Sequence, residues 1–121
     1  MAKKILIVDD EPDILRATKV RLISFGYEVI TASDGKEGIG LVRKDMPDMI
    51  LLDLRLPRIS GDEICAKLKS DEKLKHIPIV IFTASSDATT SAKVKASGAD
   101  GYLIKPFDPE ELLQTIKRFI G

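Results

Sequence analysis

The sequence predicts an α/β domain built on a doubly wound, five-stranded parallel sheet with five helices. Five short apolar runs recur along the 121 residues, and segments with helical spacing separate them. Most of these runs are apolar throughout rather than alternating with polar residues, which is typical of strands covered by helices on both faces. With 44% hydrophobic residues, a chain of this length is expected to form one domain over residues 1–121, with no output domain.

The five apolar runs are each of strand length. They span residues 5–8, 27–32, 49–52, 77–82 and 102–104. Doubly wound sheets of this size commonly have the flavodoxin-like strand order 2-1-3-4-5. This order places the second strand at an edge of the sheet and the first strand beside the third.

The first two helices are predicted from residue spacing. Leu15 and Leu22 share one side of the segment after the first strand, with charged residues on the other side. The second helix is expected near residues 35–44. It contains Gly38 and Gly40, each of which costs about 1 kcal/mol relative to alanine in a helix interior. We therefore expect this helix to depend on tertiary packing.

The last three helices are predicted from their end signals and composition. Ser60 precedes Glu63 by three residues, and Asp108 precedes Glu111 in the same way. This spacing predicts a reciprocal capping box at the start of the third and fifth helices. The fourth helix, roughly residues 87–97, is rich in Thr, Ser and Ala, so we expect it to be loosely held.

Composition argues against several classes of function. Lysine plus arginine and aspartate plus glutamate both number 19, so no net charge attracts the chain to nucleic acid or anionic lipid. The single cysteine, Cys65, cannot form an internal disulfide, and the apolar run at residues 5–8 is too short for a signal peptide or a membrane span. We expect a cytoplasmic protein that contacts neither DNA nor a membrane directly.

Residues that can carry chemistry follow four of the predicted strands. Asp9 and Asp10 follow the first strand, Asp53 the third, Thr83 the fourth and Lys105 the fifth. Ligands of parallel α/β sheets bind beyond the carboxyl ends of the strands. We therefore expect these five side chains to converge on one site.

Three carboxylates at one edge of the sheet indicate a divalent cation. Two such charges repel by about 4 kcal/mol at the effective dielectric near a protein surface, which Lys105 alone cannot offset. Mg²⁺, for which Mn²⁺ can substitute, combines carboxylates with water and a phosphoryl oxygen. The cluster therefore predicts a metal and a phosphoryl group together, with Asp53 as nucleophile and with Thr83 and Lys105 on the remaining phosphoryl oxygens.

Each of these residues also has a simpler interpretation. Asp10 or Glu11 could cap the following helix, Thr83 is a common turn residue, Lys105 could be a solvated charge, and Tyr102 could be ordinary packing. Asp53 is harder to explain in this way, because an acid at the end of a buried strand is costly without a partner. The functional interpretation depends on the coincidence of all of them.

Five short motifs carry a resemblance to a known family. They are Ile7-Val8-Asp9-Asp10-Glu11-Pro12, Leu51-Leu52-Asp53-Leu54, Pro57 followed by Gly61, Phe82-Thr83-Ala84, and Lys105-Pro106-Phe107. In this order and spacing they resemble the receiver domains of two-component response regulators, in particular single-domain chemotaxis regulators. The resemblance covers essentially the whole chain.

The resemblance implies roles for the acids and their neighbours. Asp53 would be the phosphoacceptor, Asp10 a direct Mg²⁺ ligand, Asp9 a ligand acting largely through water, and Arg55 a ligand through its backbone carbonyl. Arg55 and Ser85 would flank the phosphoryl group and influence the access of hydrolytic water.

The resemblance also implies a switch. Thr83 and Lys105 would contact the phosphoryl group, and Tyr102 would turn inward when Thr83 moves toward it. A cis peptide bond before Pro106 would aim Lys105 into the site.

The function implied is a phosphorylation-dependent signalling switch and not an enzyme, although the domain would assist its own phosphotransfer and autodephosphorylation. The phosphoryl group would come from a sensor histidine kinase, a histidine phosphotransfer protein or a small phosphodonor. The face formed by the fourth helix, fifth strand and last helix would then control a downstream protein target, with the chain as a monomer or a phosphorylation-dependent dimer.

Two rival functions stay open. A small Mg²⁺-dependent aspartyl phosphatase or phosphotransferase would also use acids and a lysine at strand ends, but such enzymes place a second aspartate where this chain has Arg55. A phosphorylation-independent interaction module is the other rival. Such a module has no need of the acids together with Thr83 and Lys105.

Overall fold

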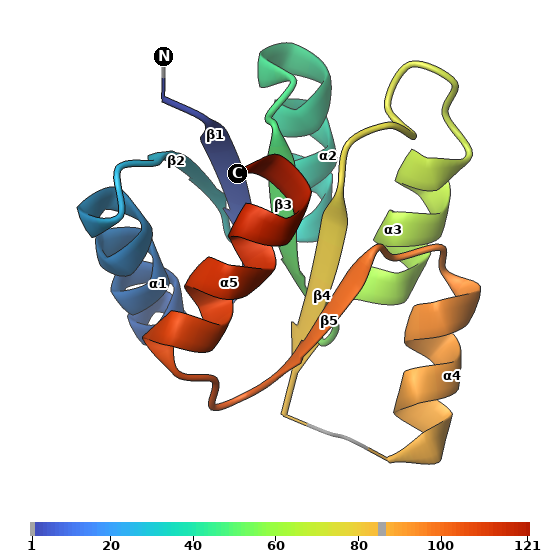
Figure 1. Ribbon diagram of the computed structural model, residues 1–121. Coiled ribbons are helices and arrows are strands. Elements are labelled where there is room, and N and C mark those ends of the chain that lie inside the picture. Colours follow the sequence, from blue (N-terminus) through green and yellow to red (C-terminus); the bar gives the residue numbers. More distant parts are fainter. Residues whose placement is uncertain (1, 85–86) are drawn as a thin grey trace.

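The fold is a central parallel sheet with helices on both faces (Figure 1). The computed structural model describes residues 2–84 and 87–121, so Ser85 lies outside the described residues. The strands are β1 (Lys4–Val8), β2 (Glu28–Ala32), β3 (Met49–Asp53), β4 (Ile79–Thr83) and β5 (Gly101–Ile104). They pair in parallel in the order β2-β1-β3-β4-β5. The predicted fold class and strand order are confirmed.

Five helices within the described ranges connect and cover the strands. They are α1 (Pro12–Ser24), α2 (Gly35–Asp45), α3 (Gly61–Lys69), α4 (Ala88–Ala96) and α5 (Pro109–Ile120). Helices α1 and α5 pack on one face of the sheet, and α2, α3 and α4 pack on the other (Figure 1). None of the helices in the described ranges combines the length and apolarity that a bilayer crossing requires.

The core lies in two layers, one on each face of the sheet. In β1, Leu6 and Val8 belong to the layer beneath α2, α3 and α4, whereas Ile5 and Ile7 belong to the layer beneath α1 and α5. Alternate residues of a strand point to opposite faces. A strand buried on both faces therefore has no polar position, which explains why the apolar runs in the sequence do not alternate.

Two of the strands were predicted to begin too early, and the other differences at strand ends are of one residue. The sequence predicts strands from residues 77 and 27, but β4 begins at Ile79 and β2 begins at Glu28. Ile77 and Tyr27 are buried, so a prediction from hydrophobicity alone includes them in the strands. Pairing of β4 with β3 begins only where Ile79 lies opposite Ile50. The ladder, and not burial, therefore sets the ends of the strands.

The reciprocal capping box predicted at the start of α3 is wrong. At α5, one of the two predicted bonds is found, in which the N-cap side chain accepts a backbone N–H. The Ser60 hydroxyl donates to the Glu63 carboxylate at 2.8 Å, and the Ser60 side chain makes no hydrogen bond to the backbone of the helix. At α5, the Asp108 carboxylate accepts the Glu111 N–H at 2.8 Å. The same residue spacing therefore gives two different bonding patterns, because the serine hydroxyl can donate to the glutamate.

Helix α2 has an N-terminal cap that was not predicted from the sequence, and it makes a close contact with the sheet. The Asp34 carboxylate accepts the Glu37 N–H at 2.8 Å, and Asp-x-x-Glu is itself a capping signature. A Cβ atom on Gly38 would lie 3.0 Å from a methyl group of Val8, whereas a Cβ on Gly40 would meet nothing within 4 Å. Close packing on β1 thus accounts for Gly38 but not for Gly40.

Helix α4 buries little apolar surface, as expected. Within the helix Val94 is buried, and the C-cap residue Ser97 is buried as well. The helix lies at the side of the molecule next to α3 and β5 (Figure 1). The prediction that this helix is loosely held is untested by the static structure and stays a prediction.

Candidate functional site

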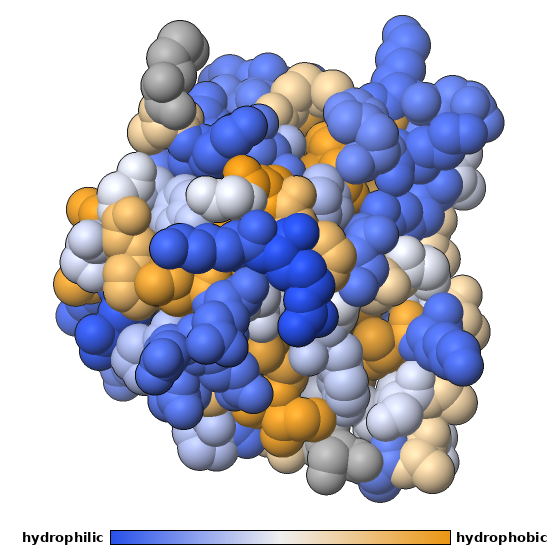
Figure 2. Space-filling model, viewed as in Figure 1, coloured by the Kyte–Doolittle hydropathy of each residue, from blue (hydrophilic) through white to orange (hydrophobic). Residues whose placement is uncertain are grey.

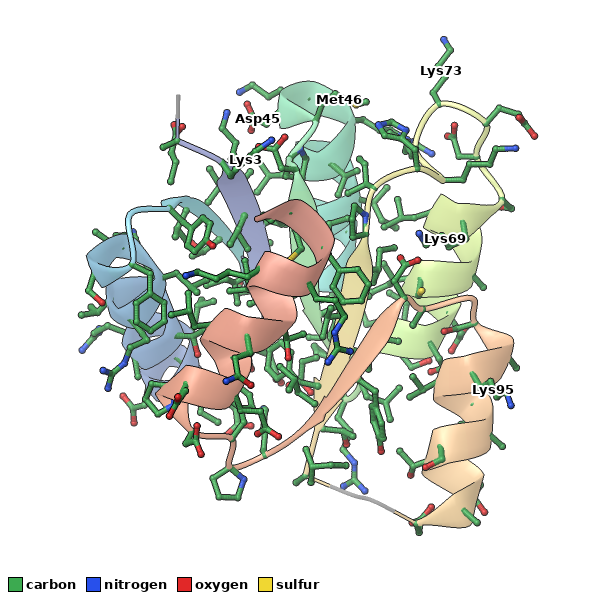
Figure 3. The ribbon with its side chains drawn as sticks, viewed as in Figure 1. Lys3, Asp45, Met46, Lys69, Lys73 and Lys95 are labelled. Atoms are coloured by element: carbon green, nitrogen blue, oxygen red, sulfur yellow. The ribbon has the colours of Figure 1, made fainter. Side chains whose placement is uncertain are left out.

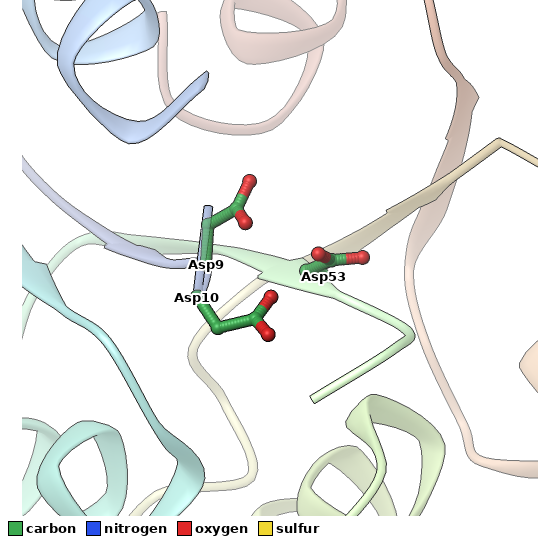
Figure 4. Close-up of side chains that lie close together, drawn as sticks. All are labelled: Asp9, Asp10 and Asp53. Atoms are coloured by element: carbon green, nitrogen blue, oxygen red, sulfur yellow. The ribbon is translucent and has the colours of Figure 1, made fainter. Parts of the chain in front are cut away.

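The predicted site residues converge at the carboxyl edge of the sheet. Asp53 and Thr83 are the last residues of β3 and β4, and Asp9, Asp10 and Lys105 follow β1 and β5 directly. Because β1, β3, β4 and β5 are adjacent and parallel, their carboxyl ends meet at one edge. The three aspartate side chains lie next to one another there (Figure 4). The topology therefore gathers residues that lie as far apart as 96 positions in the sequence.

The three aspartates form a cluster with the geometry of a cation site. Asp9, Asp10 and Asp53 each offer a carboxylate oxygen, and these oxygens lie within 4.8 Å of one another. Asp9 and Asp53 are 0% and 3% exposed, while Asp10 is exposed. Oxygen-only donors on two buried acids and one solvent-facing acid fit a hard divalent cation that retains water, such as Mg²⁺.

Lys105 lies among several carboxylates, and its ammonium is at a similar distance from three of them. Its ammonium nitrogen is 3.4 Å from Asp53 Oδ2, 3.5 Å from Asp9 Oδ2 and 3.6 Å from Glu11 Oε1. Charge-assisted N–H···O bonds are usually about 2.7–2.9 Å long. The ammonium is therefore shared among three acids, and Asp10 adds a fourth negative charge nearby. One lysine leaves this edge of the sheet with an excess of negative charge.

Backbone hydrogen bonds orient the two buried carboxylates. Asp9 Oδ1 accepts the Glu11 N–H at 2.9 Å, and Asp53 Oδ1 accepts the Arg55 N–H at 3.2 Å. In both residues the other oxygen, Oδ2, faces the Lys105 ammonium. The turns after β1 and β3 thus hold both acids in a defined orientation.

The environment of Asp53 disfavours its negative charge. Burial raises the pKa of the Asp53 carboxyl to about 6, with a further upward contribution from Asp9, while Lys105 and the Arg55 N–H oppose the rise. An attacking carboxylate must be ionised, and positive charge nearby favours the ionised form of a buried acid. A cation at the cluster would supply that charge.

Two further features bring β4, β5 and α3 against the site. The Lys105 N–H donates to the Thr83 carbonyl at 2.7 Å, and the Lys105–Pro106 peptide bond is cis. The Gly61 N–H donates to the Leu54 carbonyl at 2.8 Å, and a Cβ on Gly61 would collide with the backbone of Asp53 and Leu54. Gly61 is therefore the residue that allows α3 to start directly against the end of β3.

The remaining predicted residues have less direct relations to the cluster. Arg55 is exposed and donates its N–H to Asp53, so its role as a carbonyl ligand stays a prediction. Tyr102 is half-buried in β5, paired with Ile81 in the sheet, and packs against the core layer on the α2, α3 and α4 side. Its role as a switch also stays a prediction.

The pairing of Glu11 with Lys105 was not predicted from the sequence. Glu11 belongs to the first quoted motif, directly after the acidic pair, and a third consecutive acid was the available signal. Its interaction depends on the distance between the ends of β1 and β5, which are not neighbours in the sheet. Sequence spacing carries no information on that distance.

The chain matches known proteins along nearly its whole length. Residues 5–117 match the model of the response regulator receiver domain. The polar-differentiation response regulator DivK of Brucella ovis is 34% identical over 121 residues, which is 100% of this chain and 98% of DivK. The DNA-binding dual master transcriptional regulator RpaA of Synechocystis is 39% identical over 97% of this chain and 48% of RpaA. The chain spans about half the length, 44–48%, of several of the curated relatives that it matches, RpaA among them.

Solved structures of response regulators and receiver domains are also similar to this chain. The chemotaxis protein CheY4 of Vibrio cholerae superposes with a TM-score of 0.93 at 35% identity, covering 99% of this chain and 100% of CheY4. The receiver domain of the sensor histidine kinase PA1611 from Pseudomonas aeruginosa, with a magnesium ion coordinated in its active-site cleft, has a TM-score of 0.93 at 30% identity, covering 100% of this chain and 99% of that domain. The fold, the acidic cluster and these matches show that the chain belongs to the response regulator receiver domain family, the signalling modules of two-component phosphorelays.

Proposed function

We propose that this chain is a phosphorylation-dependent switch in which Asp53 accepts a phosphoryl group in the presence of Mg²⁺. The observation that carries the proposal is the convergence of Asp9, Asp10 and Asp53 within 4.8 Å, together with the Lys105 ammonium 3.4 Å from Asp53. We also propose that residues 1–121 act as one receiver domain.

The cation ligands and the nucleophile have distinct roles in the proposed reaction. Asp9, Asp10 and Asp53, with the backbone carbonyl of Arg55, would hold the cation. When bound, Mg²⁺ (or Mn²⁺) supplies positive charge that offsets the carboxylates and the phosphoryl oxygens. Asp53 attacks phosphorus through a carboxylate oxygen while the bond from phosphorus to the leaving group breaks.

The opposite side of the site stabilises the transferred group. The Lys105 ammonium pairs with one phosphoryl oxygen, and the buried Thr83 hydroxyl donates to another. The added group carries a charge of roughly −1.5 to −2 at neutral pH. Movement of Thr83 toward it would make room for Tyr102 to turn inward and would couple the site to the surface.

The proposed partners follow from family membership. Receiver domains pair with sensor histidine kinases, so the donor would be such a kinase, a histidine phosphotransfer protein or a small phosphodonor. The surface of α4, β5 and α5 would contact a downstream protein, because α4 is the least buried helix on its face of the sheet. Hydrogen exchange of the α4 amides as slow as that of β3 would contradict this choice of surface.

A mass measurement tests the proposal. Protein is incubated with Mg²⁺ and acetyl phosphate, and its intact mass is compared with that of Asp53→Ala treated identically. We expect one phosphoryl group on the native protein, none on the variant, and none on either protein when EDTA is present. Modification of Asp53→Ala to the same extent would refute the assignment.

The same samples distinguish the rival enzyme. Continuous release of acetate in many-fold excess over protein, without a phosphorylated species at any time, would favour a small-molecule phosphatase. An equimolar burst that matches the gain in mass would favour the switch.

A further inference from the structure

Glu11 is the partner of Lys105 that does not belong to the aspartate cluster. Its carboxylate lies 3.6 Å from the ammonium, almost as close as Asp53 at 3.4 Å and Asp9 at 3.5 Å. The Glu11 side chain is 59% exposed, whereas the Asp9 side chain is fully buried. Glu11 is therefore the one of these three acids that can move away from Lys105 into solvent.

The local structure holds the Glu11 backbone and leaves its carboxylate available. The Glu11 N–H donates to Asp9 Oδ1 at 2.9 Å, which fixes the residue beside the cluster. Glu11 occupies the N-cap position of α1, where a side chain usually accepts a backbone N–H, but it makes no such bond here. The carboxylate reaches Lys105 instead.

Open space adjoins this ion pair. Glu11 and Lys105 both line a groove of about 570 Å³ between α1 and α5, with Thr18, Ala84, Phe107 and Leu112 among the other lining residues. Figure 2 shows the side of the molecule on which α5 lies, where hydrophilic residues alternate with apolar areas. The two charged side chains can therefore separate without disturbing the core.

We propose that Glu11 is a positioning residue that restrains Lys105 at the rim of the site and sets the concentration of phosphodonor required. The inference rests on the proposed function of Asp53. A phosphodonor is an anion that needs the Lys105 ammonium and is repelled by the Glu11 carboxylate. Binding of the donor must therefore break the pair between Glu11 and Lys105, and this step raises the half-saturating donor concentration.

The expected signature is a change in donor affinity and not in the transfer step. Glu11→Gln removes the charge and leaves the size and the Asp9 hydrogen bond intact. We expect the half-saturating concentration of acetyl phosphate to fall about two- to fivefold, in keeping with a partly exposed ion pair, with the saturating rate unchanged. The effect should shrink at high ionic strength, because salt screens exposed charges.

Asp13→Asn is the matched control. Asp13 is an exposed acid in the first turn of the same helix, so this variant removes the same charge near α1. Initial rates of phosphoryl incorporation are measured against acetyl phosphate at saturating Mg²⁺, at low and high salt, for the native protein and both variants. We expect Asp13→Asn to follow the native curve at both salt concentrations, and all three proteins to unfold at the same denaturant concentration.

The outcomes separate this inference from the proposed function. If the native protein incorporates no phosphoryl group, the proposed function fails and the role of Glu11 fails with it. If the native protein is phosphorylated on Asp53 but Glu11→Gln follows the native curve or the Asp13→Asn curve, only the role of Glu11 is refuted. A fall in the saturating rate at constant half-saturation would also refute it, since that result indicates a role in the transfer step.

Discussion

Asp53 combines burial with a charge, and its raised pKa makes the stability of the protein depend on pH. The folded-state pKa of about 6 lies above the ordinary value of 3.8. Between these values the folded protein binds more protons than the unfolded protein, so the free energy of unfolding falls as pH rises through this window. Above pH 6 the full cost, about 3 kcal/mol for a shift of this size, is present.

We therefore expect Asp53→Asn to stabilise the metal-free protein at neutral pH. At pH 7 with EDTA, urea unfolding should show the variant more stable than the native protein by up to about 3 kcal/mol. At pH 4 the difference should largely vanish, because the native carboxyl is then protonated in the folded state. Equal stability at pH 7 would show that ionised Asp53 carries no cost in this site.

Gly61 is the other residue whose identity the site requires. A Cβ atom there would lie 2.8 Å from the Leu54 Cα and would collide with the Asp53 carbonyl, and backbone atoms cannot yield as a flexible side chain can. We expect Gly61→Ala to lower the free energy of unfolding by about 1–3 kcal/mol and to slow phosphoryl incorporation on Asp53. Urea unfolding and the acetyl phosphate assay measure the two effects, and native-like values in both would contradict the steric argument.

At the scale of elements, α2 contains two glycines with different surroundings. A side chain at Gly40 would extend into open space, whereas one at Gly38 would press on Val8 in β1. We expect Gly40→Ala to raise the free energy of unfolding by about 0.5–1 kcal/mol through helix propensity. Gly38→Ala should raise the free energy of unfolding less, or lower it. Urea unfolding of the two variants measures the difference. An equal gain at both positions would mean that α2 does not pack tightly on β1.

Helix α3 ends in a lysine that connects three segments (Figure 3). The Lys69 ammonium donates to the carbonyls of Lys75 at 3.1 Å and Ile77 at 2.9 Å and pairs with the Asp100 carboxylate at 2.7 Å. Asp100 also accepts the Ile79 N–H at 2.8 Å. One largely buried ammonium thus joins α3, the loop before β4 and the turn before β5.

We expect Lys69→Met to destabilise the protein by about 1–3 kcal/mol, because it removes one charged donor from several acceptors at once. Lys75→Met is the control, since Lys75 pairs with the exposed Glu72 three residues away and such pairs contribute about 0–1 kcal/mol. Chemical denaturation of both variants measures the contrast. A loss of stability no larger in Lys69→Met than in Lys75→Met would show that these contacts are not important for the fold.

At the scale of the whole molecule, the order β2-β1-β3-β4-β5 creates the site. It places β1 beside β3, so that Asp9 and Asp53 face each other, and it carries Lys105 to the same edge from the end of β5. These groups belong to segments 52 and 96 positions apart. A ligand that binds them together must therefore stabilise the folded chain and not a fragment of it.

A cation at the cluster should stabilise the whole domain by mass action. At a Mg²⁺ concentration 100 times the dissociation constant, the free energy of unfolding should rise by about 2.7 kcal/mol. The double variant Asp10→Asn with Asp53→Asn should lose this response, and Asp13→Asn should keep it. Thermal unfolding at a series of Mg²⁺ concentrations gives the measurement, and an equal response in the double variant would place the cation elsewhere.

The accuracy of the sequence-based predictions follows the range of the interactions concerned. The five strands and five helices were predicted because apolar periodicity and turn residues act locally. The convergence of Asp9, Asp10, Asp53 and Lys105 also followed, since parallel strands bring their carboxyl ends to one edge. Strand ends at Tyr27 and Ile77 were predicted wrongly, because buried residues outside the ladder have the same apolar character as strand residues.

The sequence by itself determined the fold class, the strand order expected for it and which residues meet at the carboxyl edge of the sheet, since each depends on residue type and spacing. Only the tertiary structure decided how individual side chains pair. It joined Glu11 to Lys105 and Lys69 to Asp100. The physical reason is that a hydrogen bond or ion pair depends on distances of a few ångströms. These distances are set by the packing of helices on the sheet, which residue spacing does not encode.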